Sequence, residues 1–116
     1  MTQTDWQPQV NQALQPLLQQ GVDLFFGWPT KWTSEKIQMA YRQANAAPSK
    51  YADDEPYQEH VEIYLDTFGA SAAAVSTAAK QAQALLHHIG FELTFSQDLM
   101  DPSHRHHRTE RYSKYE

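Results

Sequence analysis

The sequence predicts an α+β fold: a twisted, mostly antiparallel sheet of about five strands with two helices packed against it. Three observations lead to this prediction. Residues 59–69 alternate apolar and polar side chains, as a half-buried strand does. An alanine-rich segment from Ser71 to His88 has helical composition. Alternating segments follow it at 91–99 and 105–111, which gives the element order α-β-β-β-α-β-β.

An N-terminal amphipathic helix is predicted over residues 4–20, because apolar side chains recur there at helical spacing. They are Trp6, Val10, Ala13, Leu14 and Leu17. Pro16 has no N–H to donate inside a helix, so a kink or a break is expected there. Gly21 then suits the end of the helix.

Two strands are expected before the first long loop. The apolar run at 22–28 indicates a short strand, and residues 36–43 alternate as a second one. Residues 44–57 combine small residues, two prolines and an acidic run, which is typical of a long exposed loop. Residues 58–112 then form a β-α-β-β core, and the whole of 1–116 is expected to be a single domain.

The second helix is bounded by a serine and a glycine. Ser71 is a suitable N-cap, and Gly90 a suitable C-terminal stop. One stripe at helical spacing is expected to face the sheet, and its many alanines allow a close approach. It comprises Ala74, Ala78, Ala82, Leu85 and Ile89.

Composition narrows the class of function. The net charge of −5 disfavours general binding to nucleic acid, which requires a basic face. With no cysteine in the chain, disulfides and thiolate metal sites are excluded. No apolar run is long enough to span a membrane. No nucleotide-binding loop, nucleophile elbow or catalytic triad is evident, so an enzyme is not expected and no cofactor is assigned.

Charged and aromatic residues supply candidate contacts between subunits. Asp53, Asp54 and Glu55 form an acidic run in the long loop, and arginines cluster near the C-terminus. The arginines are Arg105, Arg108 and Arg111. Trp28 and Trp32 flank a loop and suit either a core or an interface. An acidic patch on one copy is expected to meet a basic patch on the next.

The histidines raise the question of a metal site. His104, His106 and His107 lie in the C-terminal segment, and in an extended chain His104 and His106 project to one side. The spacing identifies no specific metal and leaves a third ligand to be found, so a polar strand face is the preferred interpretation.

Several ordered segments resemble a known family. They are "GVDLFFGWP", "YADDEPYQEHVEIYLDTFG", "LLHHIGF" and "DLMDPSHRHHRTERYS". From Gly21 to Tyr112, the set is similar to the small tail terminator and tail completion proteins of long-tailed bacteriophages and prophages. The resemblance implies a twisted sheet with packed helices and no enzymatic activity. It also implies a ring of identical subunits that caps the tail tube and meets the head–tail connector proteins.

The hypothesis from sequence is therefore a virion structural protein, made in the bacterial cytoplasm and placed at the head–tail junction. Its partners would be other copies of itself, the tail tube protein and the connector, with neither a membrane nor a specific nucleic-acid sequence. A head-completion or stopper protein of the same junction is the nearest alternative. A histidine-rich metal-binding or metal-dependent protein and a small cytoplasmic binding module are the others.

Overall fold

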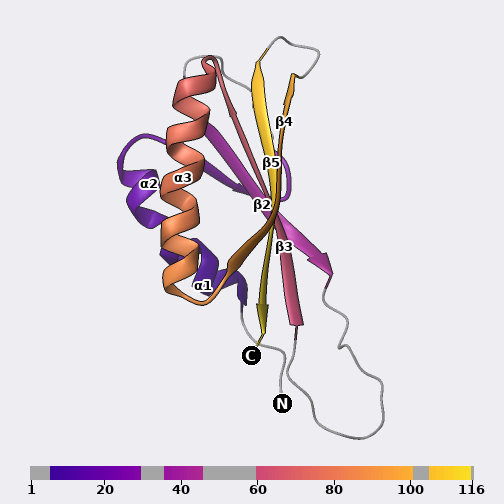
Figure 1. Ribbon diagram of the computed structural model, residues 1–116. Helices are drawn as coiled ribbons and strands as arrows, with labels where there is room; N and C mark the ends of the chain where they lie inside the picture. The colour runs from indigo at the N-terminus through magenta and orange to yellow at the C-terminus, as the bar shows by residue number, and fades with distance from the viewer. Residues whose placement is uncertain (1–5, 30–35, 46–59, 101–104, 116) are drawn as a thin grey trace, which may run out of the picture.

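The computed structural model describes residues 6–29, 36–45, 60–100 and 105–115. In this part of the chain two short helices precede three strands, and a long helix and two further strands follow (Figure 1). The elements are α1 (Trp6–Ala13), α2 (Gln15–Gln19), β1 (Asp23–Phe26), β2 (Gln38–Asn45), β3 (His60–Gly69), α3 (Ala72–His88), β4 (Glu92–Met100) and β5 (His106–Tyr115).

The five strands form one sheet in the order β1-β2-β3-β5-β4. β1 runs parallel to β2, and every other neighbouring pair is antiparallel. The α+β class and the mostly antiparallel sheet are thus confirmed. The central strand, β3, pairs along its whole length with the C-terminal strand, from His60 opposite Tyr115 to Gly69 opposite His106.

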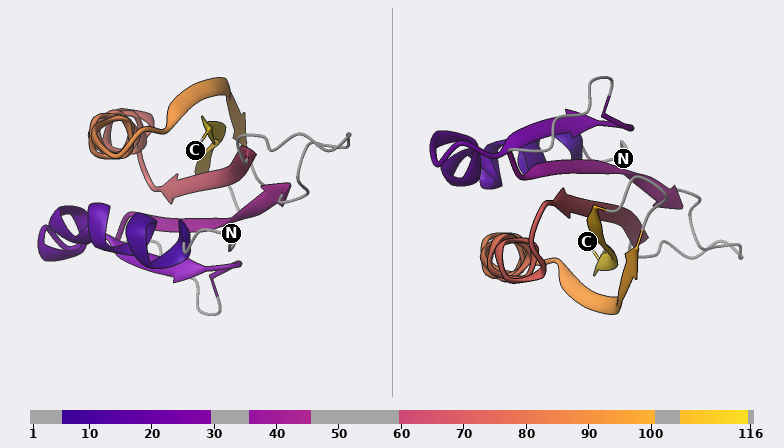
Figure 2. Two further views of the ribbon diagram at one scale, coloured as in Figure 1. Left: turned by 90° about the horizontal axis from the view of Figure 1, so that it is seen from below. Right: turned by 90° about the horizontal axis from the view of Figure 1, so that it is seen from above.

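The helices lie on one side of this sheet (Figure 2). The predicted N-terminal helix is broken, as expected near Pro16, and becomes α1 and α2. Leu14 stands at the break as the N-cap of α2, which places Pro16 within the first turn of the new helix. The missing N–H of Pro16 therefore breaks no hydrogen bond inside a helix.

The helices α2 and α3 end in the same way. Gly90 has a φ of 103°, and its N–H donates to the carbonyl of His87 while that of Phe91 donates to Leu86. Gly21 and Val22 repeat the pattern after α2. This is the Schellman motif, in which a glycine takes a left-handed conformation that a Cβ would strain. At the other end of α3, Ser71 Oγ accepts from the N–H of Ala74 at 3.0 Å, as a cap does.

The buried face of α3 differs from the predicted stripe. Leu85 and Ile89 pack half-buried against the core as predicted, but Ala74 is exposed, so that position was assigned wrongly. The residues buried against the sheet are Val75, Ala78, Ala79, Ala82 and Leu86. The helix is rotated by part of a turn from the predicted face, and this rotation buries Val75 and Leu86, which offer more apolar surface than Ala74.

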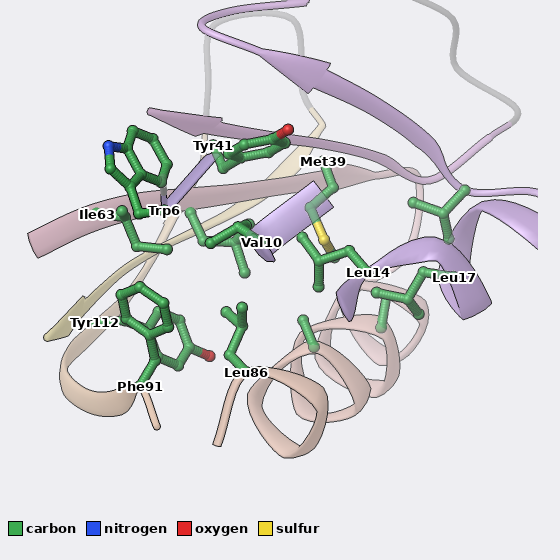
Figure 3. Packing of buried hydrophobic residues seen from close by; sticks show 14 of the residues in the cluster. Trp6, Val10, Leu14, Leu17, Met39, Tyr41, Ile63, Leu86, Phe91 and Tyr112 are labelled. Carbon is green, nitrogen blue, oxygen red and sulfur yellow. The ribbon is translucent and has the colours of Figure 1, made fainter. Parts of the chain in front are cut away.

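The main core lies between the helices and the sheet (Figure 3). Val61, Ile63 and Leu65 of β3 are all buried there, which confirms the alternation read from the sequence. Tyr41 and Tyr112 are its largest fully buried side chains. The predicted loop at 44–57 begins too early, because Ala44 and Asn45 belong to β2; the remainder lies outside the described residues.

Candidate functional site

The sheet face opposite the described helices, which we call the helix-free face, carries a row of alternating aromatic and arginine side chains. Arg42 of β2 lies between two rings, with its guanidinium carbon 4.6 Å from the centre of Trp28 and 4.7 Å from that of Tyr64. Arg111 of β5 continues the row, at 5.3 Å from Tyr64 and 6.0 Å from Phe95 of β4. These are cation–π distances. We call these five residues the arginine–aromatic row.

Strand register creates this row. Arg42 pairs with Tyr64, Tyr64 pairs with Arg111, and Arg111 pairs with Phe95. Directly paired residues on one face of a sheet have neighbouring side chains. Trp28 lies just beyond the end of β1 and completes the row. Its two ends are the most open, since Trp28 is 49% and Phe95 46% exposed.

A buried carboxylate stands beside the row. Asp66 is only 1% exposed, and it accepts from Arg42 Nη1 at 2.9 Å and lies 2.9 Å from Nε2 of His107. Burial acts to raise the pKa of Asp66, but hydrogen bonds from His107, Thr109 and Arg42 outweigh it and hold the pKa below its ordinary value. Asp66 therefore stays ionised and neutralises Arg42.

A second aromatic cluster covers the far end of the same face. Phe68 stacks on the ring of His107 with centroids 4.2 Å apart, and Trp28 lies 6.2 Å from Phe68. Arg105 sits over Phe68 at 5.0 Å and donates to Oε1 of Gln38 at 3.0 Å. Arg105 is buried, so this end of the face is closed by its own side chains.

Arg108 lies on the other side of the sheet. Its Nε donates to Asp98 Oδ1 at 2.7 Å, beside the first turns of α3. That hydrogen bond is the main reason why the pKa of Asp98 lies below its ordinary value. The two residues line a groove of about 300 Å³ together with Ala72, Ser76 and His106. Arg108, the arginine that lines this groove, already has Asp98 as its carboxylate partner.

The predicted site residues are therefore divided. Trp28, Arg105 and Arg111 share the helix-free face, whereas Arg108 does not. The other candidates lie outside the described residues; they are Trp32, Asp53, Asp54, Glu55 and His104. His106 and His107 are adjacent in β5 and so project to opposite faces. Within the described residues no three histidine or acidic side chains are grouped to hold a metal ion.

Sequence reasoning missed four members of this surface: Arg42, Tyr64, Asp66 and Phe95. The alternation in the sequence pointed to these positions, because each of the four residues lies on a strand whose polar and apolar side chains alternate. The pairing of arginine with tyrosine becomes visible only when the strands are set in register.

No described helix is long and apolar enough to cross a membrane.

Comparison with known proteins finds similarity in fold but not in sequence family. No protein-family model matches the sequence, and no curated protein matches it. A chain in a solved structure, the virion of a native gene transfer agent particle, has a similar fold. The TM-score is 0.59 at 9% sequence identity, and the match covers 91% of this chain and 90% of that chain. At this identity the similarity concerns the fold.

Proposed function

We propose that this chain is a non-enzymatic structural protein of a bacteriophage or prophage virion. The observation that carries the proposal is the fold shared, over nine-tenths of both chains, with a chain of a gene transfer agent virion. The sequence motifs between Gly21 and Tyr112 point the same way independently. We propose further that copies of the chain form a ring that completes the tail at the head–tail junction and stops growth of the tail tube.

A closed ring of identical subunits requires two different surfaces on each subunit, one for each neighbour. The helix-free face supplies one of them. Its exposed Trp28 is one of the large aromatic residues that protein interfaces favour. β4 supplies another, since this nine-residue strand pairs only with β5 among the described strands, and Phe95 and Leu99 project from it into solvent.

The proposed partners follow from this position. They are further copies of the chain, the tail tube protein on one side and the head–tail connector on the other, all within the virion. Sequence-specific contact with nucleic acid and contact with a membrane are not part of the proposal, since the net charge is −5.

The test is to delete the gene from a producing prophage and to examine the particles by electron microscopy. A tail-completion role predicts overlong or unjoined tails beside full heads, and complementation by the wild-type gene should restore normal particles. Heads that lose their DNA, with tails of normal length, would instead indicate a stopper protein at the same junction. Infectious particles of normal shape and number would contradict both roles.

The metal-binding alternative is tested separately. Addition of zinc or of a chelator is expected to leave the melting temperature of the protein unchanged, because His107 is engaged by Asp66 and His106 projects to the other face. Stoichiometric zinc binding with a rise in melting temperature would favour the alternative.

A further inference from the structure

Arg111 differs from the two nearest arginines of the sheet. Arg42 and Arg108 each bond a carboxylate, Asp66 and Asp98 respectively. In the part of the chain that the structure describes, Arg111 has no carboxylate partner. Its Nη2 donates to the neutral hydroxyl of Tyr64 at 3.2 Å, and its Nε is buried without a hydrogen-bond acceptor. A buried guanidinium nitrogen left without an acceptor is costly.

The surroundings of Arg111 suit an incoming anion. The rings of Tyr64 and Phe95 stand on either side of it, and Phe95 is 46% exposed at the open edge of the sheet. A partly desolvated guanidinium between aromatic walls forms stronger hydrogen bonds to a carboxylate than one in open water. Asp66 cannot serve, because Arg42 and His107 already hold it.

We infer that Arg111, flanked by Tyr64 and Phe95, receives a carboxylate from the acidic run Asp53–Glu55 of a second copy of this chain. The inference rests on the proposed ring and names the contact between neighbouring subunits. Charge complementarity supports it. The chain has a net charge of −5, and its three consecutive carboxylates at 53–55 form its densest acidic run. The helix-free face offers Arg111, which has no carboxylate partner among the described residues.

A charge exchange tests the contact. Arg111→Glu alone, and Asp53→Lys with Asp54→Lys alone, should each raise the concentration needed for self-association by about tenfold or more, because like charges then meet at every junction. The readout is analytical ultracentrifugation of the full chain over a range of concentrations. All three changes in one chain should restore self-association.

Mixing the Arg111→Glu variant with the variant that carries Asp53→Lys and Asp54→Lys decides whether the contact joins two copies. In a mixture, the acidic run of the Arg111→Glu chain meets the unchanged Arg111 of the other chain, and its new glutamate meets the new lysines. Self-association should therefore recover in the mixture, although each variant alone associates more weakly than wild type. Recovery only when all changes are in one chain would place the contact within a subunit and would overturn the inference.

A disulfide trap provides a second readout. The natural chain has no cysteine, so Asp54→Cys on one copy and Phe95→Cys on another leave a single possible bridge between different variants. Mild oxidation of the mixture should give the heterodimer in preference to either homodimer. A heterodimer only about twice as abundant as each homodimer, as random pairing of an equal mixture gives, would count against the inference.

Controls separate this contact from folding and from the proposed ring. Lys80→Glu makes the same change of charge on the exposed side of α3 and should leave self-association unchanged. Arg111→Met keeps the apolar stem without the charge, so it should fold, associate weakly and gain nothing from mixing. If the wild-type chain associates and Arg111→Glu leaves that association unaltered, the inference is wrong and the proposed ring is unaffected. A wild-type chain that never associates overturns the inference and the ring together.

Discussion

Nη1 of Arg42 donates to Oδ2 of Asp66 at 2.9 Å, and this ion pair lies on the sheet face opposite the described helices. The Asp66 side chain is 2% exposed and that of Arg42 is 33% exposed, so the carboxylate is buried while the guanidinium reaches the surface. Asp66 thereby holds Arg42 between Trp28 and Tyr64. One buried carboxylate thus fixes the position of an arginine between two aromatic rings of this surface.

Asp66→Asn should therefore destabilise the fold. It removes the charge that Arg42 and His107 share, and loss of a buried hydrogen-bonded charge costs about 2–3 kcal/mol. Chemical denaturation at neutral pH measures the effect. Asp23→Asn is the matched control, because Asp23 bonds Lys36 at 3.4 Å at the surface and its loss should cost no more than about 1 kcal/mol.

The contribution of Asp66 should also depend on pH. Its pKa is lower in the folded chain than the ordinary value of 3.8, so ionised Asp66 stabilises the fold above that value. The difference in stability between wild type and Asp66→Asn should shrink as pH falls below about 3.8, through the lowered pKa of the folded state. A difference that stays constant from pH 7 to pH 2 would contradict this assignment.

The contribution of Glu110 to stability should depend on pH with the opposite sign. It is 3% exposed on the core side of β5, and burial raises its pKa above the ordinary value of 4.5. Ionised Glu110 therefore opposes folding once pH rises above that value. Glu110→Gln keeps an acceptor for the Tyr112 hydroxyl, which donates at 3.0 Å. It should be more stable than wild type at pH 7 and equal to it near pH 3. The control is Glu92→Gln, at an exposed residue beside His87, which should change the stability at pH 7 by less than about 1 kcal/mol.

Gly69 leaves little room for a side chain. A Cβ there would lie 2.6 Å from Cδ1 of Ile37 and 3.0 Å from Cγ2 of Val75, where the first turn of α3 meets the sheet. Gly69→Ala should cost about 1 kcal/mol, at the low end for overpacking, because the Cδ1 end of Ile37 can turn aside. Ile37→Val removes the atom in closest contact, so the two changes together should cost less than their sum. Additive costs in this double-mutant cycle would contradict the proposed clash.

Leu86 joins the end of α3 to the core. It is fully buried, and its carbonyl accepts from the N–H of Phe91 in the turn that ends the helix. Leu86→Ala should lower the free energy of unfolding by about 2–5 kcal/mol, because it leaves a cavity. Leu18→Ala, at a position 44% exposed on α2, should change it by less than about 1 kcal/mol. Equal losses in the two variants would contradict the assignment of Leu86 to the core.

The sequence by itself determined the local elements. Alternation placed Val61, Ile63 and Leu65 on the buried face of a strand, and Ser71 with Gly90 set the limits of the long helix. Pro16 marked the break between α1 and α2. Each of these features depends on neighbours within a few residues, where periodicity and capping act.

The tertiary structure alone decided the surface. Arg42, Tyr64 and Arg111 are far apart in the chain, and they meet because β3 pairs with β2 on one side and with β5 on the other in one particular register. A shift of one residue would send these side chains to the core side. Alternation along β5 places Arg108 and Arg111 on opposite faces, although a count of basic residues had grouped them together. Register between distant strands is set by the packing of the whole sheet, and local patterns do not contain it.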